Sequence, residues 1–236
     1  MITSVILLSV AIFLVAILVP DISTNITPEK SSELGIEKTT PQIQGLPWQI
    51  EKTNDTIRVF GITLGYSTLS DAEKIFLGDG EISLFQSKSG LHSVEAYFDK
   101  VDFAGLTAKI ILVMDIPASV ASQMYERGVR ISKVGSGSNK ISIATEDLHR
   151  TRNAAVASIT YLPAINLNAK QLEARFGKPA QRITEPDSTA EHWLYPSLGL
   201  DVTLDEKNKE ILQYVKPSVF STISKPLEIV KQKTVN

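Results

Sequence analysis

Three histidines, His92, His149 and His192, are the side chains of this sequence best suited to metal or acid–base chemistry, and they lie far apart. A metal site usually combines two histidines at helical or hairpin spacing with a carboxylate. His92 and His192 form the best pair, with Glu95 and Glu191 near them, if they occupy corresponding strands of a repeated unit. Surface positions on strands are the simpler explanation. We therefore expect no metal and no cofactor.

A hydrolase would need a nucleophile and a histidine oriented by a carboxylate. His192 with Asp201 or Glu191 is the combination that could supply such a base, which keeps an enzyme as an alternative. The sequence contains no Gly-x-Ser-x-Gly motif, and residues 135–138 (GSGS) lack the preceding strand and following helix of a nucleophile turn. We expect that segment to be a flexible loop, and we assign no catalytic residue.

Three aromatic residues, Trp193, Tyr195 and Tyr214, lie on successive expected strands near the C-terminus. Aromatic residues at strand spacing usually belong to a core or pair across strands. Those that point outward make good anchors for a partner protein. These three residues are therefore the candidate binding surface.

The chain has one local excess of basic residues, which Glu126, Glu146 and Asp147 partly offset. It could be a docking face for anionic lipid or for a partner, or simply a solvated surface. Its members are Arg127, Arg130, Lys133, Lys140, Arg150 and Arg152.

Charge and composition exclude several classes of protein. The 236 residues include 24 Lys and Arg against 26 Asp and Glu, so the chain has no basic excess that would favour nucleic acid as a partner. The absence of cysteine excludes disulfides, thiolate metal sites, a cysteine nucleophile and a lipid-anchored lipoprotein.

The N-terminus carries an uncharged apolar run over residues 2–19, long enough for one membrane-spanning helix. No basic residue precedes it and no small-residue cleavage site follows it, so an uncleaved anchor (1–20) is preferred to a cleaved signal or a buried helix. Residues 21–46 are rich in Ser, Thr, Pro and Glu and are expected to be a flexible tether. The acidic flank favours a single-pass inner-membrane protein with its C-terminal domain in the periplasm.

The remaining pattern predicts an α+β fold, because short helices alternate with clusters of strands joined by short turns. A helix over 68–76 and a helix over 167–177 each end near a Phe and a Gly and are each followed by strands. We expect two related helix-plus-sheet units at 47–116 and 166–220, an inserted helical and strand segment at 117–165, and a C-terminal tail at 221–236.

The second unit resembles a known family. Phe176-Gly177-Lys178-Pro179 after a helix, then His192-Trp193-Leu194-Tyr195 and Gly199-Leu200 leading into a strand, are similar to the repeat of the SmpA/BamE small lipoproteins. In tandem, the unit resembles the β-lactamase-inhibitor-protein fold. The resemblance covers residues 167–215 well and 58–116 loosely. It implies a non-catalytic module that binds other proteins in the cell envelope, although this chain lacks the cysteine that the lipoproteins acylate.

These observations favour a membrane-anchored periplasmic module for protein interaction or scaffolding, with an envelope protein as its partner. One alternative is the envelope hydrolase based on His192. The other is an exported domain that binds a small ligand, which would need an apolar cavity between the two units.

Overall fold

The computed structural model describes residues 46, 49–53, 55–103, 105–134, 137–186, 188–205 and 208–235. The expected anchor over 1–20, nearly all of the tether over 21–46, and half of the loop over 135–138 lie outside the described residues. Within the described part of the chain, no helix is both long and apolar enough to cross a membrane.

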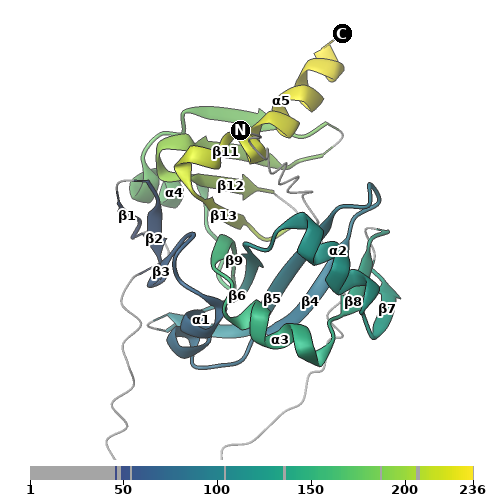
Figure 1. Cartoon of the computed structure of the whole chain (residues 1–236). Helices are drawn as coiled ribbons and strands as arrows, with labels where there is room; N and C mark the ends of the chain where they lie inside the picture. Colours follow the sequence, from purple (N-terminus) through teal and green to yellow (C-terminus); the bar gives the residue numbers. More distant parts are fainter. Residues whose placement is uncertain are drawn as a thin grey trace, which may run out of the picture.

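The fold is α+β, as predicted, and its antiparallel strands form one large sheet and one small sheet (Figure 1). The helices are α1 (Leu69–Phe76), α2 (Ala118–Glu126), α3 (Thr145–Arg152), α4 (Ala169–Phe176) and α5 (Ser221–Val235), with short 3-10 turns at Pro196–Leu198 and Pro217–Val219. The small sheet contains β1 (Glu51–Lys52), β2 (Ile57–Val59) and β3 (Ile62–Thr63).

The large sheet has ten strands in the order β10-β11-β12-β13-β9-β6-β5-β4-β8-β7. Their bounds are β4 (Glu81–Gln86), β5 (His92–Phe103), β6 (Leu106–Met114), β7 (Arg130–Lys133), β8 (Asn139–Ser142), β9 (Val156–Pro163), β10 (Gln181–Thr184), β11 (Glu191–Tyr195), β12 (Leu200–Leu204) and β13 (Ile211–Val215).

Two stretches of the chain follow the same path. Helix α1 precedes the meander β4-β5-β6-β9, and helix α4 precedes the meander β10-β11-β12-β13. The fourth strands, β9 and β13, pair with each other, so the two meanders form one continuous sheet. Strand β9 was expected within the insertion over 117–165, but it completes the first meander, and only the segment from α2 to α3 interrupts it.

The same device starts both of these helices. Thr68 caps α1 and shares a reciprocal pair of hydrogen bonds with Asp71, and Asn168 does the same for α4 with Gln171. Each pair satisfies two backbone N–H groups that a helix start otherwise leaves unbonded. The helix predicted at 68–76 therefore begins directly after Thr68, whose side chain supplies the cap.

The main core lies on one face of the large sheet, where α1, α2 and α4 bury Leu69, Met124 and Leu172 against it. Phe60, at the β2–β3 turn, inserts its ring among Phe103, Tyr161 and Tyr214, with centroid separations of 4.7, 5.2 and 5.6 Å. It adopts a φ of 54°, a conformation that a bulky residue rarely takes. Burial of the ring in this aromatic cluster offsets that local strain.

The C-terminal segment, expected to be a tail, instead forms α5 and covers the opposite face of the second meander (Figure 1). Phe220, Ile223 and Leu227 pack there against Ile183, Leu194 and Val215 in a second, smaller core. Successive residues of a strand point to opposite faces, and β11, β12 and β13 have buried residues on both faces. The corresponding face of the first meander has no such helix among the described residues.

Candidate functional site

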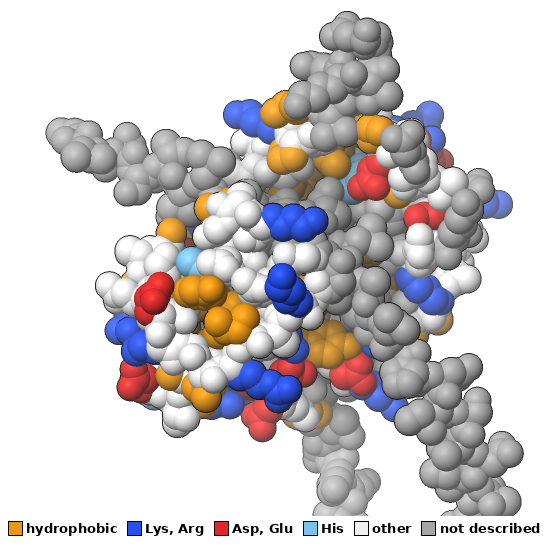
Figure 2. All heavy atoms as spheres, turned by 90° about the vertical axis from the view of Figure 1, so that its right-hand side faces the viewer, with side chains coloured by type: hydrophobic (Ala, Val, Ile, Leu, Met, Phe, Trp, Pro, Cys, Tyr) orange, Lys and Arg blue, Asp and Glu red, His pale blue; other side chains and the backbone are white. Residues whose placement is uncertain are grey.

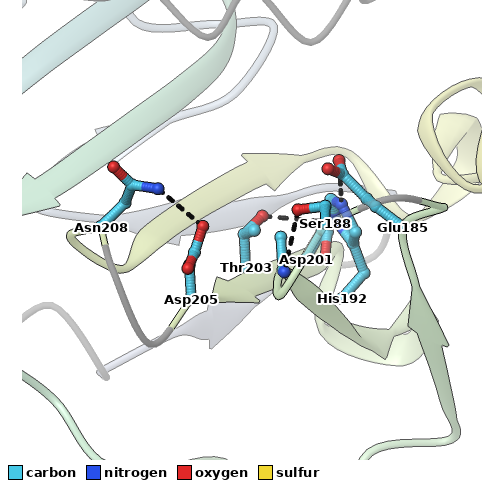
Figure 3. A network of polar contacts seen from close by, with 8 residues as sticks. Glu185, Ser188, His192, Asp201, Thr203, Asp205 and Asn208 are labelled. Atoms are coloured by element: carbon cyan, nitrogen blue, oxygen red, sulfur yellow. Dashed lines mark hydrogen bonds and ion pairs between the residues drawn. The ribbon is translucent and has the colours of Figure 1, made fainter.

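His192 is the only histidine of the described residues held by two carboxylates, and it lies on β11 under α5. Its Nδ1 is 2.8 Å from Oδ2 of Asp201 and its Nε2 is 3.0 Å from Oε1 of Glu185. Thr203 places its hydroxyl 3.4 Å from Nδ1. Figure 3 shows Glu185 and Asp201 approaching the ring from different sides. The pairing of Leu194 with Asp201 and of His192 with Thr203 in β11 and β12 puts these side chains on one face of the sheet.

The environment of His192 favours the protonated ring. Burial by itself lowers the pKa of His192, but the hydrogen bonds and negative charges of Asp201 and Glu185 outweigh burial and raise the pKa above its ordinary value. Both ring nitrogens then donate to carboxylates. With 1% of the residue exposed, the ring has neither a free nitrogen nor access to a substrate. This arrangement suits a structural ion cluster better than a general base.

Of the two carboxylates predicted as partners of His192, the structure brings Asp201 to it and not Glu191. Glu191 points to the other face of β11, where it accepts a hydrogen bond of 2.5 Å from Nε1 of Trp193. Glu185, in the loop after β10, takes the position beside Nε2. Sequence reasoning missed Glu185 because no local pattern indicates that the loop after β10 brings this side chain back to His192.

The pairing of His92 with His192 is wrong. The two residues lie on β5 and β11, five strands apart in the sheet order, or about 24 Å at ordinary strand spacing. They also point to opposite faces, since His92 contacts α2 on the main-core side. Among the described residues, no group of three or more His, Asp or Glu could hold a metal ion. Asp201 and Glu185 contact different nitrogens of the His192 ring, so the two carboxylates and the ring do not converge on one point where a metal ion could bind.

His92 belongs to a chain of polar side chains whose directions are set. Oε1 of Gln86 accepts from Asn139 Nδ2 at 3.0 Å, so Gln86 Nε2 donates to His92 Nε2 at 3.2 Å. The proton of the neutral ring must then lie on Nδ1, which donates to the hydroxyl of Ser122 at 3.1 Å. Burial lowers the pKa of His92 and keeps this neutral form. His92 therefore cannot take a proton from Ser122.

The aromatic binding surface is wrong as well. Trp193, Tyr195 and Tyr214 are 2%, 4% and 0% exposed and belong to the main core. The alternation of β11 places Trp193 and Tyr195 on the side that α4 covers, and Tyr195 donates to the backbone oxygen of Gly177 at 3.0 Å. These residues hold the second unit together and are not available to a partner.

Some residues of the basic cluster form ion pairs with carboxylates, and others do not. Arg127 bonds to Asp147 at 2.6 Å, Lys140 to Glu81 at 2.6 Å and Arg152 to Glu73 at 3.3 Å. Within the described part of the chain, Arg130, Lys133 and Arg150 show no hydrogen bond or ion pair of their side chains.

Two of those unpaired residues, Arg130 and Lys133, lie on β7, an outer strand of the large sheet. All four residues of β7 are exposed: its apolar residue Ile131 is 56% exposed, and Val129 directly before the strand is 74% exposed. The side of the molecule with α2, β7 and β8 shows apolar side chains close to lysine and arginine side chains (Figure 2). Sequence reasoning did not predict β7, although the segment Val129-Arg130-Ile131-Ser132-Lys133 alternates apolar and polar residues.

A hollow of about 240 Å³ lies on the uncovered face of the first meander and reaches the β8 hairpin. It does not lie between the two units, where the ligand-binding alternative would place a cavity. Its walls come from β4, β5, β6 and β8 and from Val134, directly after β7. The residues around it are Glu81, Ser83, Phe85, Glu95, Tyr97, Ile111, Val134 and Lys140.

Comparisons of the chain with protein-family models, with curated proteins and with solved structures found no match.

Proposed function

We propose that this protein is a membrane-anchored interaction module of the cell envelope, and that it binds an extended acidic segment of a partner protein along β7. One observation carries the proposal: β7 is an exposed outer strand whose side chains combine apolar surface with unpaired positive charge. An extended peptide can add to such an edge because the backbone N–H and C=O groups on its outer side are open to pairing.

The charges of β7 argue against a second copy of the chain as the occupant. A second β7 strand would bring its own Arg130 and Lys133 to this edge and no acidic side chain to balance them. Like charges brought together at one interface repel each other. An acidic segment with an apolar residue beside Ile131 would instead match both the charge and the apolar surface.

The arrangement of the two meanders supports a binding role over a catalytic one. We infer that α1 with β4-β5-β6-β9 and α4 with β10-β11-β12-β13 are two related units, as the resemblance to tandem SmpA/BamE-like repeats suggests. In that family such units bind other envelope proteins. Both ring nitrogens of the buried His192 face carboxylates, and Nδ1 of His92 carries the proton that it donates to Ser122. Neither contact is that of a base with a nucleophile, which argues against the hydrolase alternative.

The anchor and compartment remain part of the proposal. We infer that residues 2–19 span the inner membrane and that the folded part lies in the periplasm. Resistance of the full chain to alkaline carbonate extraction, lost when residues 2–19 are deleted, would support the anchor. Protection of the folded part from protease in sealed spheroplasts would contradict the periplasmic orientation.

Site-specific crosslinking in living cells tests the binding face. A photoreactive amino acid replaces Val129 or Ile131 in the full chain, and Leu77, which is 59% exposed near α1, provides the matched control position. We expect a discrete adduct from the β7 positions and not from Leu77, with the crosslink mapping to an acidic extended segment. Arg130→Glu should reduce that adduct, whereas Lys225→Glu on the exposed side of α5 should not.

Other outcomes would overturn the proposal. Equal adducts at Leu77 and β7, or none at β7 despite efficient crosslinking elsewhere, would remove β7 as the binding face. A turnover that disappears with His192→Ala while the fold persists would favour the hydrolase.

A further inference from the structure

The hollow on the first meander combines apolar walls with one carboxylate that lacks a cationic partner. Phe85 on β4, Ile111 on β6 and Val134 after β7 provide its apolar surface. Glu95 lies on β5, between Ser83 of β4 and Val113 of β6 in the sheet register. The hollow therefore has an acidic group on its floor and hydrocarbon around it.

The charges around the hollow leave Glu95 as its unbalanced group. Lys140 is the one lysine or arginine among the lining residues, and its Nζ is 2.6 Å from Oε1 of Glu81. Glu95 receives one hydrogen bond, from the hydroxyl of Ser93 at 2.8 Å, and no ion pair among the described residues. Burial raises the pKa of Glu95, and the Ser93 hydrogen bond opposes that shift. A carboxylate with so little compensation gains from a bound cation.

The size of the hollow limits the ligand that it can hold. An apolar cavity of about 150 Å³ is large enough for benzene, and this hollow of about 240 Å³ has room for an aromatic ring with a short chain. An anion would meet Glu81 and Glu95 with only one lysine, already paired, to balance them. A neutral apolar molecule would leave Glu95 with the Ser93 hydrogen bond alone and would cover it from water, at a cost in affinity.

We propose that this hollow binds a small organic amine of the arylalkylamine class, with its ammonium group on Glu95 and its ring between Phe85 and Ile111. This site is on the face of the sheet opposite the main core and does not use the open edge of β7. The amine site and the β7 surface can therefore fail or succeed independently.

Calorimetric titration of the full chain in lipid nanodiscs tests the amine site with three probes of similar size. Phenethylamine carries the ammonium group, 2-phenylethanol is its neutral counterpart and 3-phenylpropionate is an anion. We expect the amine to bind about tenfold more tightly than the alcohol, the ratio that one partly buried charged hydrogen bond can supply. Empty nanodiscs give the contribution of partition into lipid, and no saturable binding of the anion is expected.

Two variants and a matched control separate charge from shape. Glu95→Gln keeps the size of the side chain and should weaken amine binding about tenfold while alcohol binding stays the same. Ile111→Trp fills the hollow, leaves Glu95 in place and should abolish binding of both probes. Glu51→Gln, an exposed carboxylate on β1, should change neither.

Circular dichroism and thermal melting of each variant establish that it is folded before its affinity is compared. Should Glu95→Gln fail to fold, the probe comparison on the unchanged chain and the Ile111→Trp variant still decide the question. Equal affinity for amine and alcohol, no saturable amine binding, or unchanged amine binding in a folded Glu95→Gln or Ile111→Trp variant would overturn the proposal.

Discussion

A buried histidine between two carboxylates stabilises a fold only while it carries its proton. His192 is in that position, with Asp201 at 2.8 Å and Glu185 at 3.0 Å from its two nitrogens. Removal of the proton would leave one ring nitrogen facing a carboxylate as a second acceptor. The protonation state of this one residue is therefore linked to the stability of the second unit.

The linkage predicts the direction of a pH effect. The pKa of His192 is raised in the folded state above the ordinary value of 6.5, so its contribution is complete below that value and is lost as pH rises through the folded-state pKa. The quantity to follow is the free energy of unfolding of the native chain minus that of His192→Ala. We expect this difference to fall as pH rises from the ordinary pKa of histidine through the raised pKa of His192. Urea unfolding at a series of pH values measures it, and subtraction removes the effects of other titrating groups such as Glu95.

Replacement of His192 should also be costly at a single pH. His192→Ala leaves Asp201 and Glu185 without their shared cation, and removal of one partner of a buried ion pair typically costs about 3–5 kcal/mol. Urea unfolding near pH 6 should show a loss of this order. His149→Ala, at an exposed position on α3, is the control and should change stability little; equal losses would mean that the cluster contributes nothing particular.

At the scale of elements, α5 differs from the other helices because it alone covers the second face of a meander. Its contact side consists of Ile223 and Leu227, with Phe220 directly before the helix, whereas Ile229 on α5 is 53% exposed. Ile223 is buried and Ile229 is exposed on the same helix. Replacing each by Ala changes helix propensity equally, so a difference in stability between the two variants reports the burial of Ile223.

Truncation of the buried isoleucine should loosen α5. Ile223→Ala is expected to cost about 2–4 kcal/mol, because a buried Ile loses both its transfer energy and its packing, and Ile229→Ala should cost far less. Urea unfolding gives the stability difference, and limited proteolysis should detect cleavage near α5 earlier in Ile223→Ala. Similar stabilities for the two variants would contradict the packing of α5 on the sheet.

The elements that the sequence predicted well are those with strong local signals. The helix at 68–76 was predicted because its cap and its apolar face lie within ten residues. The α5 helix was missed because its apolar residues become a face only against Ile183 and Leu194, which lie far away in the sequence.

The same limit applies to the candidate sites. The sequence offered Asp201 or Glu191 as the partner of His192, and only Asp201, on the neighbouring strand, contacts it. Trp193 and Tyr195 were predicted to be exposed but belong to the main core. The alternation of residues along a strand shows which of them share a face, but it does not show which face other elements cover. The hollow around Glu95 was missed, since three strands and a later hairpin must come together before its walls exist.

At the scale of the whole molecule, the pairing of β9 with β13 makes the two meanders one sheet. Leu212 lies opposite Tyr161 and Tyr214 opposite Ile159 across this junction, and the side chains of all four belong to the main core. Backbone hydrogen bonds and a shared core thus cross from one unit to the other.

This continuity predicts that the two units unfold together. Amide hydrogen exchange should give similar opening free energies for the central amides of β6 and β12, which belong to different units. Two distinct values, each confined to one unit, would show instead that the units open separately and that the junction is weak.

The place of β9 in the sheet has a consequence for the order in which the chain can fold as it is made. Strand β6 ends at Met114, but its neighbour β9 begins only at Val156, after α2, β7, β8 and α3. One edge of β6 therefore stays open while this intervening segment emerges, and the edge of β9 stays open until β13 follows. The middle of the finished sheet, its best protected part, is the last part that the growing chain can complete.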